Sequence, residues 1–587
     1  MFKMFKNFTK KDWLIILMCF ILIATQVWLD LKLPDYMSSI TTLIQTENSS
    51  IVDILLQGVY MLICALGSLI SAIIVGFLTS RLSANFSLNL RKRIFRKVGK
   101  LGMEEIKKFE TSSLITRTTN DVTQIEMFIA MGLQMLIKSP IMAIWAVSKI
   151  LNKNLEWSML TGGCVVILLL TVITLLLIVF PRFEKVQKLI DKVNGVTREN
   201  LTGIRVIRAF NAEKYQQNRF EKVNNNLTNM QMFNQKCFAI LNPIMNLVMH
   251  SLTLGIYIIG AILISKAGLL DKINLFSNMV VFTSYGMQVI ASFLMLAMIF
   301  MILPRAQVSA KRINEVLDSD ISIKDGNLDV KNTKEIGTVE FKNVSFKYPD
   351  ADEYLLKNIS FKVEKGETIA FIGSTGSGKS TLINLVPRFY DVTEGEILID
   401  GINVKDYTLE SLNNKIGYVP QKAVMFTGTV KSNVGYGDNG KKDISLNKIK
   451  EAIEIAQATD FITKMDKSYD AHIARGGTNV SGGQKQRLAI ARAIARDPEI
   501  YIFDDSFSAL DYKTDSILRK ELKKYTKDAT LMIVAQRIGT ILSADKIVVL
   551  DKGECVGIGS HKELLKKCKV YKEIALSQVT KEELQNG

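Results

Sequence analysis

The 587-residue sequence predicts an all-α six-helix transmembrane domain followed by an α/β domain built around a phosphate-binding loop. Up to about Leu303, apolar stretches of about 20 residues recur, which is the length that crosses a bilayer as a helix. From Thr338 onward, short β-rich runs alternate with turns, and one run ends in a glycine-rich loop that opens a helix. A chain of this length is expected to hold at least two domains.

The membrane half is expected to contain six spans. They are Trp13–Trp28, Ile54–Leu78, Met127–Val147, Met159–Phe180, Phe238–Ile264 and Leu275–Leu303. Long polar segments of helical composition separate the second span from the third and the fourth from the fifth. These two loops are therefore expected to protrude from the membrane.

The distribution of basic residues predicts the orientation, because lysine and arginine are retained on the cytoplasmic side. The segment "RKRIFRKVGK" (Arg91–Lys100) and the N-terminal lysines lie on one side, whereas the expected outer loop Lys32–Asp53 has one lysine against three acids. We expect a multi-pass protein of the cell membrane with both termini and both long loops in the cytoplasm. No cleavable signal is expected, and "MFKMFKNFTKKDW" suits a short helix in the membrane interface.

The net charge of +17 arises from 74 Lys and Arg against 57 Asp and Glu. Much of this excess lies in juxtamembrane loops, where attraction to anionic lipid headgroups is a sufficient cause, so membrane lipid is an expected partner and nucleic acid is not. The six cysteines include no CxxC pair, which indicates neither a zinc site nor a disulfide framework.

The segment "FIGSTGSGKST" (Phe371–Thr381) follows an apolar strand and matches the pattern G-x-x-x-x-G-K-S. Its glycines let backbone N–H groups curl around phosphate oxygens, Lys379 is placed to reach the β- and γ-phosphates, and Ser380 offers a hydroxyl to Mg²⁺. A plain glycine-rich turn is the weaker alternative for a full match in this context. The predicted nucleotide contacts here are Gly373, Ser374, Thr375, Gly376, Ser377, Gly378, Lys379, Ser380 and Thr381.

A second glycine turn, "SGGQ" (Ser481–Gln484), precedes a helix and then the strand "IYIFDD". The strand ends at Asp504, which is expected to hold Mg²⁺. Alone, this turn has little specificity, but its spacing from the other two motifs makes it far more specific.

With these motifs in place, the chain resembles an ATP-binding-cassette (ABC) exporter half-transporter, and the resemblance covers nearly the whole sequence. It implies an α/β P-loop ATPase domain with a helical subdomain, with domains at 1–320 (transmembrane), 321–337 (linker), 338–575 (nucleotide-binding) and 576–587 (tail). It implies two facing chains, with each ATP held between one chain's phosphate loop and the other chain's turn, Ser481, Gly482, Gly483 and Gln484.

The same resemblance implies further roles. Tyr348 stacks on adenine, Gln421 senses Mg²⁺ and water, Asp511 contacts the facing chain, and the metal residues are Ser380, Gln421 and Asp504. A core aromatic is the alternative for Tyr348. Two segments, "FETSSLITRTTNDV" (Phe109–Val122) and "TRENLTGIRVIRAFNAE" (Thr197–Glu213), resemble the loops that carry coupling helices.

Two catalytic positions depart from the family pattern. Asp505 stands where a glutamate normally orients the attacking water, and Gln536 stands where a histidine contacts the γ-phosphate. Aspartate is shorter by one methylene, and a misplacement of roughly 1 Å can cost on the order of 10²-fold in rate. Glutamine can donate a hydrogen bond but cannot carry a proton or a positive charge. A third departure is Arg475 in "ARGGTN", which stands where the family often has an acidic residue. The resemblance therefore does not extend to the contact between that loop and the coupling helices.

These departures predict a site that binds MgATP well and hydrolyses it slowly, beside an intact "SGGQ" turn. The hypothesis that fits both features is a heterodimer, in which a second half-transporter with glutamate and histidine completes a competent site using this chain's turn.

Small amphiphilic compounds are the expected substrate, by resemblance, with lipids or hydrophobic peptides as alternatives. A nucleotide-gated regulator that moves nothing is the rival from another class, and an importer subunit is a weaker one. The spans contain polar residues and methionines that face either substrate or other helices: Lys138, Asn246, His250, Gln288, Met279, Met287, Met295, Met298 and Met301.

Overall fold

The computed structural model describes Lys3 and residues 8–46, 49–151, 155–329, 336–437 and 444–578. Residues 1, 2 and 4–7 of the expected interface helix, part of the expected linker and most of the expected tail lie outside these residues. The chain forms two compact units. The helical unit comprises Met1–Gly99 with Phe109–Ser319, and the sheet unit comprises Lys100–Lys108 with Asp320–Gly587.

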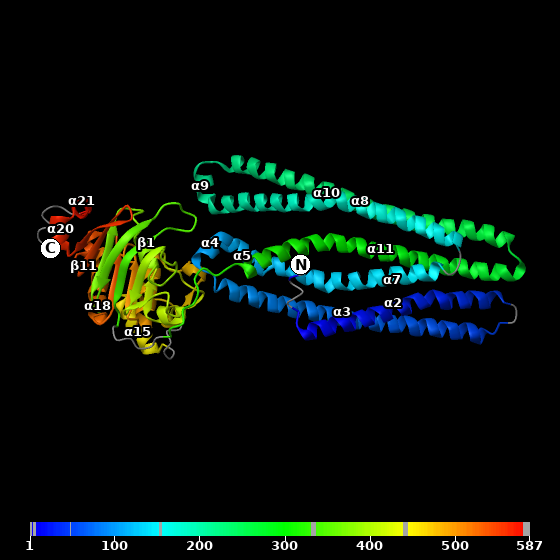
Figure 1. Cartoon of the computed structure of the whole chain (residues 1–587), viewed down its shortest axis with the longest axis horizontal. Coiled ribbons are helices and arrows are strands. Elements are labelled where there is room, and N and C mark those ends of the chain that lie inside the picture. The colour runs from blue at the N-terminus through cyan, green and yellow to red at the C-terminus, as the bar shows by residue number, and fades with distance from the viewer. Residues whose placement is uncertain are drawn as a thin grey trace. The chain divides into compact units, whose positions relative to one another are not determined.

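The helical unit is built from long apolar helices. In chain order the described helices are α2 (Lys10–Gln45), α3 (Ile51–Val98), α5 (Thr111–Thr118), α6 (Asn120–Met127), the π-helical turn Phe128–Gly132, α7 (Leu133–Leu151), α8 (Leu155–Thr202), α9 (Ile204–Ala209), α10 (Glu213–Lys266) and α11 (Leu269–Asp318). Six helical stretches of the described chain are long and apolar enough to cross a membrane. Figure 1 shows α2 beside α3 and α8 beside α10, with α9 between the latter two.

The first helix is longer than the sequence pattern indicates. The expected outer loop Lys32–Asp53 is wrong in its bounds, because α2 continues through Pro34 to Gln45 and α3 begins at Ile51 after the N-cap Ser50. The polar residues that suggested a loop are paired inside the bundle: Asp30 with Lys138 and Asp35 with Lys149. A helix can continue past such residues when neighbouring helices neutralise them.

The sheet unit begins with the short helix α4 (Met103–Phe109), whose last residue belongs to the helical unit, and continues after Asp320. Its described strands are β1 (Val339–Phe346), β2 (Leu356–Val363), β3 (Thr368–Gly373), β4 (Glu394–Ile399), β5 (Ile402–Asn403), β6 (Ile416–Val419), β7 (Gly428–Thr429), β8 (His472–Ile473), β9 (Ile500–Asp504), β10 (Thr530–Val534), β11 (Lys546–Asp551) and β12 (Glu554–Gly559).

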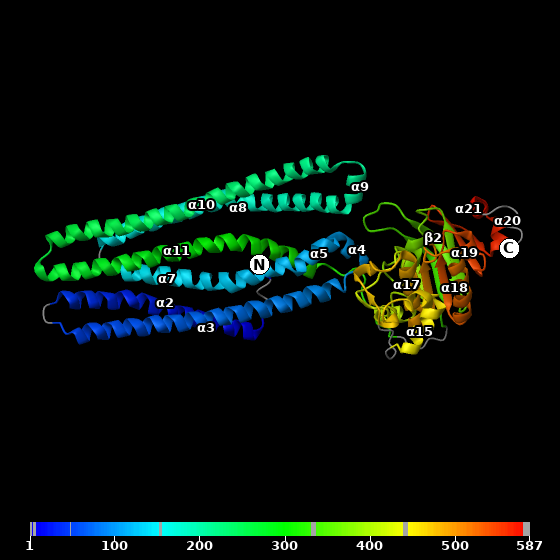
Figure 2. The ribbon, with the colours of Figure 1, turned by 180° about the vertical axis from the view of Figure 1, so that it is seen from behind.

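The helices of the sheet unit, after α4, are mostly short. They are α12 (Lys379–Asn384), α13 (Leu409–Asn414), α14 (Val430–Val434), α15 (Leu446–Ile455), α16 (Thr459–Ile462), α17 (Gly482–Arg496), α18 (Tyr512–Tyr525), α19 (Ile538–Ile541), α20 (His561–Lys567) and α21 (Lys569–Gln578), with 3₁₀ turns at Ser468–Asp470 and Arg475–Gly477. Figure 2 shows α15, α17 and α18 from the opposite side to Figure 1.

Two sheets organise this unit. An antiparallel sheet has the order β2-β1-β4-β5, and a larger sheet has the order β12-β11-β3-β10-β9-β6, in which all neighbours except β12 and β11 run parallel. Strand β3 is buried on both faces: Ile369 and Phe371 join the core shared with the antiparallel sheet, while Ala370 and Ile372 join the core beneath the helices. This double burial explains the continuous apolar sequence of β3. Because β3 and β9 both pair in parallel with β10, their carboxyl ends lie near one another at the same edge of the sheet.

The predicted fold class is confirmed: apolar helices are followed by an α/β unit whose phosphate-loop strand lies at the centre of a parallel sheet.

Candidate active site

The phosphate loop joins the buried strand β3 to helix α12. Gly376 and Gly378 have φ angles of +85° and +94°, a region that residues with a Cβ rarely adopt. A Cβ on Gly378 would also lie 2.6 Å from Leu356 Cδ2. The loop conformation therefore requires glycine at these two positions. The expected helix start near Lys379 is confirmed.

Lys379 is folded back onto this loop. Its ammonium donates hydrogen bonds to the carbonyl oxygens of Gly373 (2.9 Å) and Ser374 (2.8 Å) and lies 3.4 Å from Ser377 Oγ. Burial lowers the pKa of Lys379, and the charges of Asp505 and Asp504 oppose that shift. Bound phosphate oxygens would replace these carbonyls as partners of the ammonium.

Asp504 and Ser380 meet across the loop. Ser380 Oγ donates a 2.8 Å hydrogen bond to Asp504 Oδ1 at the end of strand β9, and Asp504 is 5% exposed. Burial raises the pKa of Asp504, and the charge of Asp505 adds to the rise, while Ser380 and Lys379 lower it. A buried carboxylate beside a hydroxyl is the kind of hard oxygen set that Mg²⁺ takes, so these residues fit the predicted metal.

Asp505, the first residue that departs from the family pattern, is held by two glutamines. Its Oδ2 accepts hydrogen bonds from Gln536 Nε2 at 2.8 Å and from Gln421 Nε2 at 3.2 Å. Burial raises the pKa of Asp505, and the bonds from Gln421 and Ser508 oppose that rise. The structure thus brings together all three residues that the sequence indicated as catalytic, at a single carboxylate oxygen.

The backbone also fixes this carboxylate. Asp505 has a φ of +48°, and its N–H donates to the carbonyl oxygen of Val534 at 3.1 Å. Because the backbone is fixed in this way, the reach of residue 505 depends on its side chain alone. The carboxylate of an aspartate therefore ends one methylene short of the position that a glutamate would reach.

The turn Ser481–Gln484 forms the cap of helix α17. Ser481 Oγ accepts from the N–H of Gln484 at 3.3 Å, and Gln484 Oε1 accepts from the N–H of Ser481 at 2.9 Å, which is a capping box. Among the residues that the structure describes, Ser481 and Gln484 bond each other rather than the phosphate loop. Ser481 and Gly482 are exposed at the surface of the sheet unit.

Asp511 has a similar local role. It caps helix α18 by accepting from the N–H of Thr514 at 3.0 Å, and this backbone bond lowers its pKa. Arg475, the third departure, lies exposed at the start of a 3₁₀ turn whose Gly476 and Gly477 both have positive φ angles.

Tyr348 lies beside the phosphate loop and is half-buried. Its hydroxyl is 3.0 Å from Thr381 Oγ1, and its ring packs at about right angles against Phe346 and Tyr390, with ring centroids 5.0 Å and 5.3 Å away. The tyrosine ring and the loop residues that follow Lys379 therefore form one local cluster.

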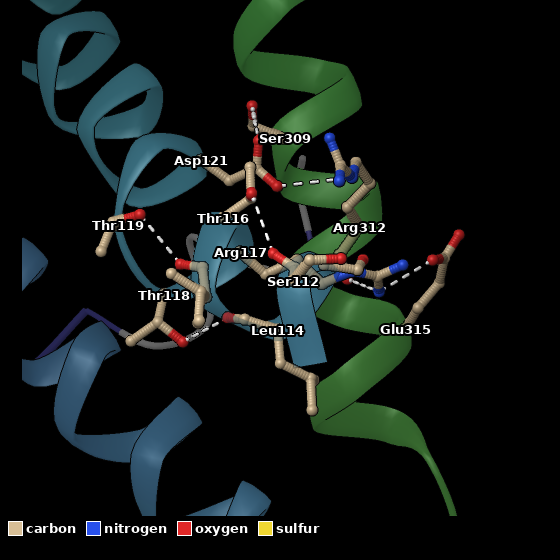
Figure 3. Close-up of polar contacts among 12 residues, drawn as sticks. Ser112, Leu114, Thr116, Arg117, Thr118, Thr119, Asp121, Ser309, Arg312 and Glu315 are labelled. Atoms are coloured by element: carbon tan, nitrogen blue, oxygen red, sulfur yellow. Dashed lines mark hydrogen bonds and ion pairs between the residues drawn. The ribbon is translucent and has the colours of Figure 1, made fainter. Parts of the chain in front are cut away.

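The first of the two loop segments, Phe109–Val122, is anchored to the base of α11 (Figure 3). Arg117 donates to the carbonyl oxygen of Arg312 at 2.5 Å and pairs with Glu315 at 3.0 Å. The buried Asp121 accepts from Ser309 Oγ at 2.9 Å and pairs with Arg312 at 3.5 Å. These four charged residues were not among the expected site residues, although charges at the end of a membrane span are a usable signal.

The second segment, Thr197–Glu213, covers the end of α8 and the short helix α9. Apolar side chains are exposed here: Val206 is 61% exposed and Phe210 is 78% exposed. Exposed apolar groups of this kind indicate an interaction surface.

The polar residues expected in the spans fall into two groups. Lys138 pairs with Asp30 at 3.4 Å, and Gln288 donates to the backbone carbonyl of Asp30 at 3.3 Å. Asn246 and His250 are exposed on α10.

The acidic partners in the membrane helices were missed, although an aspartate next to an apolar span is itself a signal. Asp35 accepts from Tyr285 Oη at 2.6 Å and pairs with Lys149 at 2.7 Å. Of the methionines, Met279 is buried, Met287 and Met298 are exposed, Met295 is half-buried, and the side chain of Met301 lies outside the described residues.

Membrane-length helices and a phosphate loop beside a buried aspartate define a membrane protein with a nucleotide-hydrolysing domain. Residues 14–312 match the model of the ABC transporter transmembrane region, and residues 356–508 match the ABC transporter model. The chain therefore belongs to the ABC transporter family, as a multi-pass membrane protein that carries its own ATP-hydrolysing domain.

Similar proteins agree with this assignment. An uncharacterized ABC transporter ATP-binding protein of Mycobacterium tuberculosis H37Rv is 37% identical over 523 residues, which cover 88% of this chain and 86% of that protein. A putative multidrug export ATP-binding/permease protein of Staphylococcus aureus NCTC 8325 is 33% identical and covers 83% of both chains. The solved structure of a bacterial Atm1-family ABC exporter with ATP bound has a TM-score of 0.83, 25% identity and coverage of 97% of this chain and all of the other.

Proposed function

We propose that this chain is one half of an exporter that uses ATP to move amphiphilic or hydrophobic compounds across the cell membrane by alternating access. Its transmembrane domain is 1–320, its linker 321–337, its nucleotide-binding domain 338–575 and its tail 576–587. Both termini and the nucleotide-binding domain are cytoplasmic. The Staphylococcus relative named as a multidrug exporter and the Atm1-family exporter structure support export as the direction.

The contact between Gln536 and Asp505 is the observation that carries the proposal. The amide that stands in the histidine's place donates to the shortened carboxylate, and a second amide, from Gln421, donates to the same oxygen. A carboxylate held in this way by neutral donors is poorly placed to accept a proton from water. This chain's own site is therefore one that binds ATP and hydrolyses it slowly.

The residues expected to bind MgATP are all present in this chain's own site. Lys379 binds the phosphates, and Tyr348 stacks on adenine. Ser380, Gln421 and Asp504 would hold Mg²⁺. When bound, Mg²⁺ neutralises charge on the β- and γ-phosphates. The slow site therefore keeps its affinity for nucleotide.

The cap formed by Ser481 and Gln484 supports a contact with a facing chain. The turn is ordered and exposed, as a surface that contacts a facing chain should be. A partner half-transporter with glutamate and histidine at the two departed positions would form its competent site against this turn. A homodimer of this chain would instead contain two intact Ser481–Gln484 turns but two slow sites.

Substitutions at the two departed positions test this division of labour in the complex purified through a tag on this chain. Asp505→Asn should leave transport and ATP hydrolysis nearly unchanged, whereas substituting the partner's glutamate should abolish both. Asp505→Glu combined with Gln536→His should raise ATP hydrolysis, because the second site would then turn over. Asp528→Asn, an exposed aspartate of the same unit, is the matched control. Equal loss of transport from the two single carboxylate changes would contradict the proposal, and ATP hydrolysis that no candidate substrate stimulates would favour a regulatory subunit.

A further inference from the structure

The ring of Tyr348 is covered by a cation from helix α4. The ammonium of Lys107 lies over this ring, 5.0 Å from its centroid, and 5.8 Å from the centroid of Tyr390. Lys107 and both tyrosines belong to the sheet unit, which includes Lys100–Lys108. Because the two rings stand perpendicular to one another, the ammonium sits in the corner between them.

Two residues that pack on the tyrosine ring differ in exposure. Lys107 is an exposed residue, whereas Phe346, which also packs on Tyr348, is buried. The hydroxyl of Tyr348 is engaged at Thr381, next to the phosphate loop. The face of Tyr348 under Lys107 is one of the two on which a base held by that loop can stack.

We propose that Lys107 is a nucleotide-displaced cover of the adenine position, which an arriving ATP must push off Tyr348. The inference rests on the proposed function, since it takes Tyr348 as the stacking residue. The ammonium and the base compete for one aromatic face. An exposed cation–π contact corresponds to about a two- to five-fold change in an equilibrium constant, so removing the cation should tighten nucleotide binding by about that factor.

The displacement would act on helix α4. Helix α4 is fastened at Glu105, whose Oε1 accepts from the backbone N–H of Ser322 at 3.1 Å. Lys107 is two residues further along, and Glu110, with a φ of +54°, then links α4 to α5. Releasing Lys107 frees the end of α4 next to α5 while its Glu105 contact persists. The released end of α4 is the end that continues through Glu110 into α5.

Photolabelling of this chain by 8-azido-ATP, in the intact complex at low temperature, tests the inference, because the labelled chain is recovered by itself through its tag after denaturation. Lys107→Gln should lower the half-saturating nucleotide concentration about two- to five-fold. Lys107→Arg, which keeps a cation, should not change it, and neither should Lys108→Gln, a change at the exposed neighbour. In a Tyr348→Leu background the effect of Lys107→Gln should disappear.

Unchanged or weaker labelling in Lys107→Gln would overturn the inference, as would an effect that persists in the Tyr348→Leu background. These results are distinct from failure of the proposed stacking role. If Tyr348→Leu alone labels as tightly as the parent, the role of Tyr348 itself is wrong. If it labels weakly while Lys107→Gln changes nothing, only the cover is wrong.

Discussion

Two neighbouring aspartates at the end of strand β9 have different surroundings. The carboxylate of Asp504 is bonded by the Ser380 hydroxyl and that of Asp505 by two amides, and burial raises the pKa of both. Two carboxylates are thus buried side by side, and the charge of Lys379 offsets the cost of their burial only in part, because both pKa values stay raised. Such a site is expected to be less stable without MgATP than with it.

Asp504→Asn should raise the thermal stability of the nucleotide-free protein while it abolishes Mg²⁺-dependent ATP binding. Because folding raises the pKa of this carboxyl, its charged form costs stability at any pH above the folded pKa. The gain from asparagine should therefore be full at neutral pH and vanish below the ordinary value of 3.8, where the acid is protonated in folded and unfolded chains alike. Each kcal/mol gained would shift the midpoint by about 2–4 °C.

Intrinsic fluorescence during heating, between pH 3 and 8, measures this shift. Asp528→Asn on the surface is the control. A lower midpoint for Asp504→Asn at neutral pH would show that the carboxylate is better compensated than its contacts indicate.

At the scale of helices and strands, two ion pairs join α5 and α6 to the C-terminal end of α11, the last membrane helix, and we call this pair of contacts the clamp. Arg117 and Asp121 face Glu315 and Arg312, with the charges reversed between the two pairs (Figure 3). Helix α11 ends at Asp318, directly before the sheet unit resumes. The clamp ties the loop segment Phe109–Val122 to the helix that leads into the nucleotide-binding domain.

Arg117→Glu should uncouple transport from ATP hydrolysis. The substitution places like charges beside Glu315 and loses the bond to the Arg312 carbonyl, so substrate stimulation of ATP hydrolysis should fall several-fold while basal hydrolysis changes little. Adding Glu315→Arg should restore part of the stimulation. Lys92→Glu, an equal charge change at an exposed position of α3, should have no effect. A swap that restores nothing would show that the ion pair is not the coupling contact.

Asp35→Asn should destabilise the helical bundle. It weakens the pair with Lys149 and the bond from Tyr285, two contacts that join α2 to α7 and α11. Losing a charged hydrogen-bond partner costs about 1–3 kcal/mol. Thermal aggregation of the solubilised complex measures the loss, with the exposed Asp53→Asn as control. An unchanged midpoint would show that Lys149 and Tyr285 find other partners.

Local motifs were predictable from the sequence, and contacts between distant segments were not. Gly376, Gly378 and Lys379 are adjacent in the chain, so backbone geometry alone indicated the loop and the start of α12. Residues 505 and 536 are separated by a helix and a strand, and only the parallel pairing of β9 with β10 brings them together. The end of α2 was misjudged for a similar reason, because Asp30 and Asp35 are neutralised by lysines more than 100 residues away.

At the scale of the whole molecule, the proposed asymmetry separates two sets of residues in one chain. The phosphate loop and Asp505 belong to the slow site, whereas the turn at Ser481 belongs to the site completed by the partner. Substitutions in the two sets should therefore differ in their effect on the same complex.

Ser481→Ala should lower ATP hydrolysis by the complex far more than Asp505→Asn does. It removes an N-cap worth about 1 kcal/mol to α17 and the hydroxyl that, in the proposed heterodimer, would face the partner's nucleotide. Thr429→Ala, which removes the comparable cap of α14 in the same unit, separates the loss of a helix cap from the loss of the signature hydroxyl. If Ser481→Ala and Asp505→Asn reduce hydrolysis equally, the two sets serve equivalent sites and the asymmetry is wrong.

Native mass spectrometry of the complex, extracted from its own membranes through a tag on this chain, tests the heterodimer most directly. We expect one copy of this chain with one different subunit of comparable mass, whose sequence has glutamate and histidine where this chain has Asp505 and Gln536. A complex of two copies of this chain alone would contradict the account, because both of its sites would then carry the substituted pair.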